Sequence, residues 1–146
     1  MDGVVVIDKP LGLTSFDVVA QVRRRLSEKR VGHAGTLDPL ATGVLVVCLG
    51  EATKLVPVLM DADKEYRATA RLGATTDTDD ADPQGRVLSR AEPEALAALD
   101  EAKVRTALLQ QLGWTMQRPP RFSALKTGGQ RLYDLSRKVQ EGRGTL

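Results

Sequence analysis

Apolar and polar positions are grouped in blocks along the N-terminal third of the chain, and these blocks predict two buried strands with a helix between them. The β-branched run 4–7 predicts a buried strand that ends before Pro10, whose backbone has no N–H for a ladder. Thr14 and Asp17 have the spacing of a capping box, which predicts the start of a helix. The apolar residues that recur at helical intervals after this start are Phe16, Val19, Val22 and Leu26. The apolar run 44–49 predicts the second buried strand.

The rest of the pattern alternates between short strands and helices. Residues 31–43 are not periodic and are rich in glycine, which predicts a loop. A short helix is predicted over 51–59, an alternating strand over 65–72 and a short strand over 86–89. The longest helix is predicted over 93–112, with a proline in its first turn. Because these elements lack the regular spacing of a doubly wound sheet, we predict a mixed α+β fold.

Composition favours a soluble globular chain, with 42% apolar and 27% charged residues. The longest apolar run is too short to cross a bilayer, and no signal-peptide pattern opens the chain, so we expect a cytoplasmic protein without membrane association. Cys48 and His33 are the single cysteine and the single histidine, which excludes an internal disulfide and a zinc site of the usual Cys/His kind. No glycine-rich motif for nucleotides is present. We therefore expect chemistry without a metal or a cofactor.

Charge is unevenly distributed behind the net charge of +2. Residues 61–104 carry six Lys/Arg and eleven Asp/Glu, whereas residues 105–146 carry eight and two. A basic end is typical of a chain that binds a polyanion, and it is equally typical of a solvated basic tail. Pairs of prolines and glycines also appear beyond residue 112, with one helical stretch predicted over 132–139. We divide the chain into a body over 1–112 and a basic arm over 113–146.

Two acidic stretches are candidates for chemistry. The loop 77–82 lacks the glycine and the final glutamate of a calcium-binding loop, which favours a solvated loop or one whose carboxylates accept backbone N–H bonds. Asp38 precedes Pro39 in a glycine-rich loop, where its carboxylate could act as a nucleophile without a cofactor. The alternative is an Asp-Pro turn whose carboxylate caps a neighbouring N–H. The spacing by itself favours this alternative.

A resemblance to a known family changes that balance. The segment GHAGTLDPLATGVL at 32–45 resembles the signature of the tRNA pseudouridine-55 synthases, the TruB family. Four more segments resemble the family in the same order, namely VVVIDKPLG (4–12), CLGEATK (48–54), DKEYRATARLGATTDTDDADPQG (63–85) and PPRFSALKTGGQRLYDLSR (119–137). The resemblance therefore covers nearly the whole chain.

The resemblance implies a pseudouridine synthase fold, with a mixed, mostly antiparallel sheet flanked by helices. It also implies an isomerase that binds the T-stem-loop of tRNA and flips out one uridine. The enzyme detaches the base from the ribose, rotates it and rejoins it through carbon 5, with no metal or cofactor. We expect a monomer. Residues 1–112 would then be the N-terminal part of the catalytic domain, and residues 113–146 would be a thumb-like arm that closes over the RNA.

The resemblance also assigns roles to individual residues. Asp38 takes the position of the catalytic nucleophile, for which an ionised carboxylate and an extruded base are suitable chemistry. His33 would hold the flipped-out T-loop, and Tyr66 would pack on the target base; the alternatives are an ordinary surface or core histidine and an ordinary core tyrosine. The residues expected to support the catalytic loop are Lys9, Pro10, Gly35 and Thr36. The residues of the arm expected to contact RNA are Lys126, Arg121 and Arg131.

The sequence departs from the family at several points. Nothing after Arg137 resembles the family's second half, which carries the arginine partner of the catalytic aspartate and a C-terminal PUA-like domain. We therefore expect a chain that is truncated before that half. Pro83 replaces a usual glycine, and Arg121-Phe122 replaces the more frequent Met-Tyr. Three functions stay open: a synthase, a non-catalytic module that binds or folds tRNA, and an unrelated carboxylate-dependent hydrolase, which lacks a second acidic residue at matched spacing.

Overall fold

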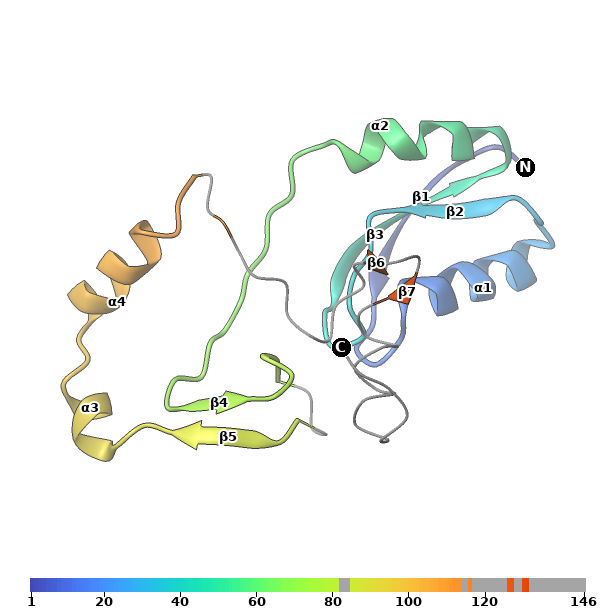
Figure 1. Cartoon of the computed structure of the whole chain (residues 1–146). Helices are drawn as coiled ribbons and strands as arrows, with labels where there is room; N and C mark the ends of the chain where they lie inside the picture. Colours follow the sequence, from blue (N-terminus) through green and yellow to red (C-terminus); the bar gives the residue numbers. More distant parts are fainter. Residues whose placement is uncertain (82–84, 114–115, 117–125, 128–129, 132–146) are drawn as a thin grey trace. The chain divides into compact units, whose positions relative to one another are not determined.

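The computed structural model describes residues 1–81, 85–113, 116, 126–127 and 130–131. The chain divides into two compact units, Met1–Ala68 and Thr69–Leu146 (Figure 1). The predicted mixed α+β class is confirmed, and every strand pair in the described ranges is antiparallel. Among these residues, no helix is both long and apolar enough to cross a membrane.

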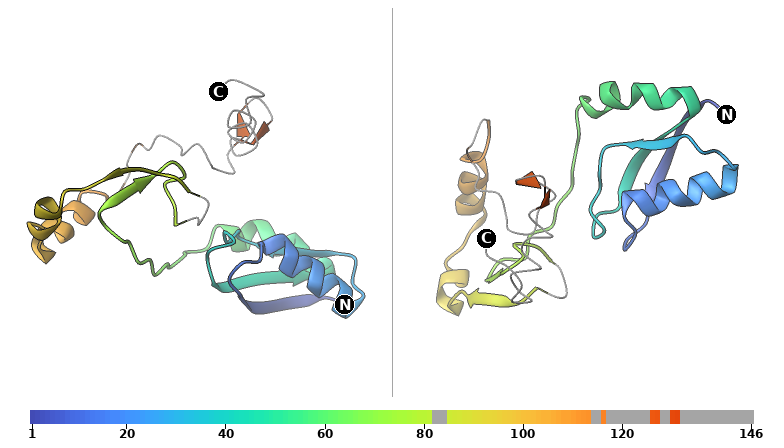
Figure 2. Two further views of the ribbon diagram at one scale, coloured as in Figure 1. Left: turned by 90° about the horizontal axis from the view of Figure 1, so that it is seen from below. Right: turned by 45° about the vertical axis from the view of Figure 1, so that its right-hand side comes forward.

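The first unit is a three-stranded sheet with helices on its faces. Its elements are β1 (Gly3–Lys9), α1 (Ser15–Leu26), β2 (Val31–Ala34), β3 (Gly43–Leu49), the 3₁₀ helix η1 (Gly50–Leu55) and α2 (Val56–Met60). The strand order is β1-β3-β2, so β3 has a neighbour on each side. Leu45 of β3 lies opposite Ile7 of β1, and Leu49 lies opposite Val31 of β2. Figure 2 shows α1 running along one side of this sheet and α2 along another.

The core of this unit lies between α1 and one face of the sheet. Its buried apolar residues are Val18, Val19, Val31, Leu45, Val47 and Leu49. The prediction of a buried strand over 44–49 is confirmed for most of β3, because this strand is central and α1 covers it. The predicted helix over 51–59 is present as η1 followed by α2.

The predicted capping box begins α1, but the buried face of this helix differs from the prediction. Thr14 Oγ1 accepts from the Asp17 N–H at 3.1 Å, and the Thr14 N–H donates to Asp17 Oδ2 at 2.9 Å. The buried residues of the helix are Ser15, Val18 and Val19. Phe16 is 63% exposed, so the expectation that it belongs to the core is wrong.

Three other predictions differ from the structure for reasons of pairing: the burial of the first strand, the loop 31–43 and the strand 65–72. The first predicted strand is present as β1, but Val4, Val5 and Val6 are all exposed, because β1 is an edge strand. The predicted loop 31–43 contains the strand β2. This strand forms through backbone hydrogen bonds to β3, which the pattern of apolar residues does not reveal. The segment 65–72 forms no strand, because no ladder partner lies beside it in the described residues.

The second unit consists of short elements. They are β4 (Ala74–Thr76), β5 (Val87–Arg90), α3 (Pro93–Ala97), α4 (Glu101–Leu109), β6 (Lys126–Thr127) and β7 (Gln130–Arg131). The single long helix predicted over 93–112 is two helices, because Asp100 caps a new start by accepting from the Lys103 N–H at 2.8 Å. The strand predicted over 86–89 is β5, and the stretch 132–139 lies outside the described residues.

The acidic loop between β4 and β5 accepts backbone N–H bonds, as one of its two predicted interpretations requires. Asp77 Oδ1 accepts from the Arg86 N–H at 2.8 Å, and Asp80 Oδ1 accepts from the Ala81 N–H at 2.7 Å. The Asp77 carboxylate therefore bonds across the hairpin, whereas that of Asp80 holds the backbone of its own turn.

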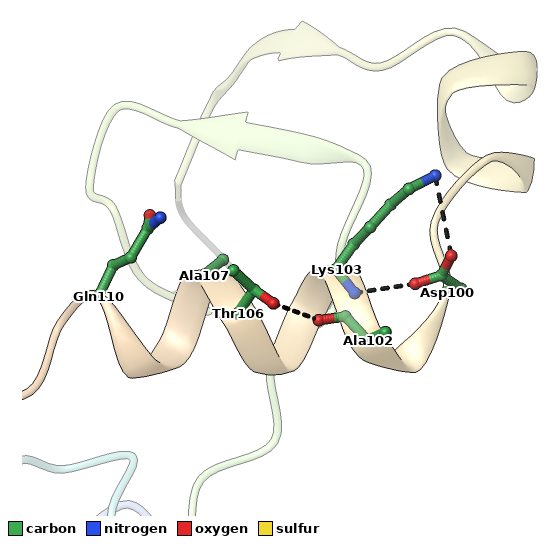
Figure 3. Close-up of a pocket in the computed structure, with 6 residues that line it drawn as sticks. All are labelled: Asp100, Ala102, Lys103, Thr106, Ala107 and Gln110. Atoms are coloured by element: carbon green, nitrogen blue, oxygen red, sulfur yellow. Dashed lines mark hydrogen bonds and ion pairs between the residues drawn. The ribbon is translucent and has the colours of Figure 1, made fainter.

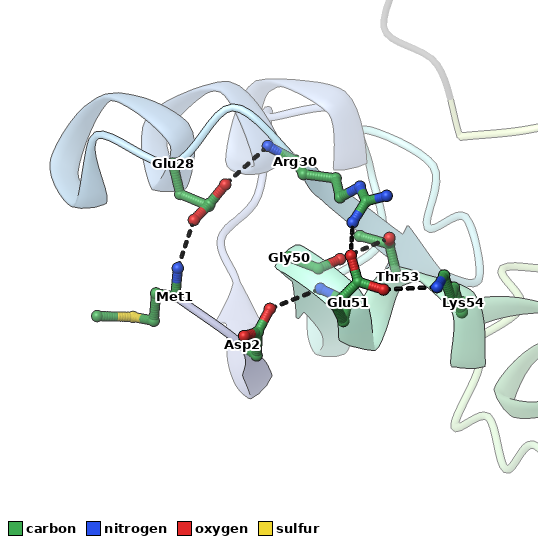
Figure 4. A network of polar contacts seen from close by, with 8 residues as sticks. All are labelled: Met1, Asp2, Glu28, Arg30, Gly50, Glu51, Thr53 and Lys54. Atoms are coloured by element: carbon green, nitrogen blue, oxygen red, sulfur yellow. Dashed lines mark hydrogen bonds and ion pairs between the residues drawn. The ribbon is translucent and has the colours of Figure 1, made fainter.

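A polar network joins the start of the chain to two turns of the first unit (Figure 4). The Met1 amino group donates to Glu28 at 2.7 Å, beyond the end of α1. Asp2 accepts from the Glu51 N–H at 2.7 Å, and Glu51 pairs with both Arg30 and Lys54. These contacts stabilise one end of the sheet. The loop that carries Asp38 lies at the opposite end.

Candidate active site

Asp38 lies on the loop that connects β2 to β3, residues 35–42, which we call the β2–β3 loop. Its carbonyl oxygen accepts from the Ala41 N–H at 3.0 Å, so the backbone turns immediately after it. Its side chain is exposed and makes no hydrogen bond or ion pair within the described residues. The predicted alternative of a carboxylate that caps a turn is therefore not seen: the turn is made by backbone, and the carboxylate faces solvent.

Two hydrogen-bonded anchors hold the backbone on either side of Asp38. In the first, which we call the Ser15 anchor, the buried Ser15 hydroxyl donates to the Leu37 carbonyl at 3.1 Å and accepts from the Leu37 N–H at 2.9 Å. In the second, the Gly12 anchor, the Gly12 N–H donates to the Pro39 carbonyl at 2.8 Å. The residues before and after Asp38 are thus both attached to the segment that leads into α1.

Sequence reasoning did not identify Ser15 or Gly12 as parts of this site. A signal for Ser15 was available. It lies at helical spacing from Val18, Val19 and Val22, which form the inward-facing side of α1, and it is the polar residue on that side. A serine among apolar neighbours in such an arc needs a hydrogen-bond partner when it is buried. The signal for Gly12 is weaker. Its φ of +84° requires a glycine for the turn itself, so the presence of glycine does not indicate a further hydrogen-bonding role.

Lys9 stabilises the turn that contains the Gly12 anchor. Its side chain is fully buried, and Nζ donates to the Pro10 carbonyl at 3.0 Å and to the Leu13 carbonyl at 2.6 Å. The ammonium group therefore ties together both ends of the short segment between β1 and α1. Removal of these donors would leave two carbonyl oxygens without their partner.

His33 lies on β2, two residues before the start of the β2–β3 loop. The ring is half-buried, and its Nδ1 is 2.7 Å from the Gly35 carbonyl oxygen. A carbonyl only accepts, so Nδ1 carries the proton of this bond. Gly35 has a φ of +109°, a conformation that side chains disfavour, and Thr36 is exposed.

The other predicted site residues belong to other segments of the chain. Tyr66 is 67% exposed in a segment without regular structure, so the alternative of a core tyrosine is wrong. Lys126 and Arg131 are opposite partners in the β6–β7 ladder of the second unit. Arg121 lies outside the described residues. Their predicted contacts with RNA stay predictions.

The second unit has a hollow along α4 that does not offer a site (Figure 3). It is lined by Asp100, Ala102, Lys103, Thr106, Ala107 and Gln110. Lys103 pairs with Asp100 at 3.8 Å, and the Thr106 hydroxyl donates to the Ala102 carbonyl at 2.8 Å, so several of its polar groups are already matched within the helix. No group of three or more metal-ligating side chains comes together in the part of the chain that the structure describes.

Comparison with known proteins gives one family. The profile described as TruB family pseudouridylate synthase (N terminal domain) matches residues 23–144. The tRNA pseudouridine synthase B of Syntrophus aciditrophicus (strain SB) is 53% identical over 138 residues, which are 94% of this chain and 42% of that protein. The tRNA pseudouridine synthase B of Corynebacterium jeikeium (strain K411) is 51% identical over 136 residues, which are 93% and 44%.

A solved structure agrees with these relatives. The crystal structure of a Cbf5-Nop10-Gar1 complex matches with a TM-score of 0.56 and 31% identity, over 85% of this chain and 31% of that one. The chain thus spans less than half of the length of the two relatives named above. The family match covers most of the chain, including the β2–β3 loop and both strands that flank it. The chain therefore belongs to the TruB family of pseudouridylate synthases, whose N-terminal domain it matches.

Proposed function

We propose that this chain acts on tRNA as a pseudouridine synthase and that Asp38 is the nucleophile. The observation that carries the proposal is the presentation of this carboxylate: its side chain is exposed, while the Ser15 and Gly12 anchors hold the residues before and after it. A nucleophile on an anchored backbone needs little reorganisation before it attacks. Family membership supplies the reaction class, and the loop supplies an accessible group that suits it.

The proposed substrate is the T-stem-loop uridine, extruded from its stack. A nucleotide within a stacked loop hides its reactive atoms, so an enzyme that acts on the base must first extrude it. Asp38 then attacks C1′ of the ribose, and the bond from C1′ to N1 of the base breaks. The rotated base forms a bond from carbon 5 to C1′ as the bond to Asp38 breaks, and the proton lost from carbon 5 is balanced by one gained at N1. The product contains the same atoms as the substrate, so the reaction consumes no co-reactant.

The other predicted residues have supporting roles in this proposal. His33 holds the opened loop of the RNA, with the ring orientation set by its bond to Gly35. Tyr66 packs on the target base. The residues that bind phosphates are Lys126, Arg121 and Arg131. The residues that maintain the shape of the β2–β3 loop are Lys9, Pro10, Gly35 and Thr36. We place the protein in the cytoplasm as a monomer.

The test is to incubate the chain with a tRNA transcript and to map pseudouridine at each position. We expect product at the T-loop uridine, and none with Asp38→Asn, which keeps the size of the side chain but removes its charge. Asp61→Asn is the matched control, because Asp61 is an exposed aspartate outside the β2–β3 loop. Product that persists in Asp38→Asn would contradict the assignment of the nucleophile.

A second function, an RNA-binding module without activity, is favoured by one observation. No cation lies within ion-pair distance of Asp38 among the residues that the structure describes. The two functions separate in the same experiment, because a module would bind the transcript in a salt-dependent manner and form no product.

A further inference from the structure

Three large apolar side chains are exposed around the β2–β3 loop. Leu11 is 65% exposed, Phe16 is 63% exposed and Leu40 is 40% exposed. We call these three residues the apolar rim. A single exposed apolar residue is ordinary, but several that border one functional loop indicate a surface that contacts a ligand.

The anchors of the loop place the apolar rim next to it. Leu11 and Leu40 are the chain neighbours of the two residues joined by the Gly12 anchor. Phe16 directly follows the residue that makes the Ser15 anchor. Leu40 is two residues from Asp38 along the chain. Leu11 and Phe16 each neighbour a residue that is hydrogen-bonded to a chain neighbour of Asp38. The rim contains one aromatic ring, that of Phe16.

Arg23 holds this ring in its exposed position. The guanidinium carbon lies over the Phe16 ring, 5.8 Å from its centroid, a cation–π distance. Nη2 of the same group donates to the Val31 carbonyl at 2.7 Å, which fixes the guanidinium to β2. Its Nε is buried and has no partner among the described residues. The ring is therefore supported on one side by a fixed cation, and most of the residue remains in solvent.

We propose that Phe16 is a positioning residue that stacks on a nucleobase of the bound RNA beside Asp38. This inference rests on the proposed function. A nucleobase has a flat π-face that stacks on an aromatic ring whatever its identity. Arg24 is exposed on the same helix, about a quarter of a turn round from Phe16, and supplies charge for an adjoining phosphate. An apolar protein partner would instead have to cover the guanidinium of Arg23 against the ring and the exposed Arg24, which is why the observations favour RNA.

The experiment uses the whole chain and a labelled T-stem-loop hairpin RNA. Affinity is measured by fluorescence polarisation, and 5-iodouridine at each loop uridine in turn gives photo-crosslinks that are mapped by mass spectrometry. We expect a crosslink to Phe16 and about tenfold weaker binding by Phe16→Leu, which stays apolar but cannot stack. Phe16→Tyr keeps both properties. Val58→Ala is the matched control, because Val58 is an exposed apolar residue of α2, outside the rim.

The outcomes separate the inference from the proposed function. If the unaltered chain binds the hairpin and Phe16→Leu binds it equally well, Phe16 does not stack and the inference fails alone; a surface reserved for a protein partner would give this result. If Phe16→Leu lowers the melting temperature as well as the affinity, the ring is a packing residue and the inference also fails. If the unaltered chain does not bind the hairpin, the inference and the proposed function fail together.

Discussion

Lys9 shows how a single buried cation organises the approach to the candidate site. Its three-donor ammonium group is enclosed by protein and bonded to two backbone carbonyls on either side of a tight turn. The resemblance to the family drew attention to this residue, but nothing in the local pattern predicted its complete burial. Lysine is rarely buried without a partner, so the carbonyls must compensate for the lost water.

Lys9→Met tests this arrangement, because methionine has similar length but no donors. We expect the free energy of unfolding to fall by about 2–4 kcal/mol, since two carbonyls lose their partner in a buried turn. Urea denaturation followed by circular dichroism measures the change. Lys29→Met, at an exposed lysine, should change stability by less than about 0.5 kcal/mol. Equal effects of the two substitutions would contradict the structural role of Lys9.

The exposure of Phe16 shows that the spacing of apolar residues alone does not identify the buried face of a helix. The sequence placed the buried face of the helix on residues at helical spacing that were all apolar, and this choice included Phe16. The structure rotates the face by about one residue, so that Ser15, Val18 and Val19 are buried. Ser15 is polar, and its burial depends on Leu37, which lies far away in the sequence. A local pattern cannot supply that partner.

At the scale of elements, the connection between α1 and the β2–β3 loop is the feature most relevant to function. Ser15→Ala removes both hydrogen bonds to Leu37, while the alanine methyl group still occupies most of the space of the serine side chain. We expect the rate of pseudouridine formation to fall about tenfold or more, with hairpin affinity changed less than twofold, because the loop loses its position and not its binding groups. Single-turnover kinetics and fluorescence polarisation measure the two quantities. An equal loss of affinity would instead indicate that the whole RNA surface has changed.

The polar network at the opposite end of the sheet predicts a pH dependence. The bond to Glu28 raises the pKa of the Met1 amino group, and the bond from that amino group lowers the pKa of Glu28. The contribution of the pair is therefore present above the ordinary glutamate pKa of about 4 and below the ordinary amino-terminal pKa of about 8. It is lost as pH falls through the lowered pKa of Glu28 or rises through the raised pKa of Met1.

Thermal unfolding of Glu28→Gln against pH checks this prediction. The difference in melting temperature from the unaltered chain should be largest near pH 6, and it should vanish in strong acid and in strong base. Glu65→Gln, at an exposed glutamate, should show no such window. A difference that persists unchanged into strong base would contradict the ion pair.

The elements themselves were predictable where the information is local. The capping box, the strand before Pro10 and the central strand are all encoded within a few residues of their position. In contrast, β2 exists because β3 pairs with it, and the alternating segment 65–72 is not a strand because alternation does not supply a neighbour. For the site, the resemblance indicated Asp38 and His33, whereas the anchors that hold the loop required the fold.

At the scale of the whole molecule, burial is confined to one of the two units. Every buried residue among those described belongs to Met1–Ala68, and the helices of the second unit expose their leucines. Stability should therefore be concentrated in the first unit. The family resemblance could not predict this asymmetry, because its matching segments lie in both units.

Hydrogen–deuterium exchange of the intact chain tests this distribution. We expect the amides of β3 to exchange slowest, and those of α3, α4 and segment 63–72 to exchange at least about tenfold faster. Mass spectrometry of peptides from a quenched digest gives the rates. Protection in α4 as strong as in β3 would contradict the assignment of the core to the first unit.

The pairing of β3 with both of its neighbours also restricts how the β2–β3 loop can evolve. The loop joins β2 to its own ladder partner β3, and β3 also pairs with β1, so an insertion or deletion of one residue that the loop does not absorb between the Ser15 and Gly12 anchors would shift β3 and move Leu45 and Val47 to the outward face. Side chains on the loop can be exchanged one at a time, but its length cannot change alone. Drift in this part of the gene should thus appear as substitutions, and gaps should accumulate elsewhere.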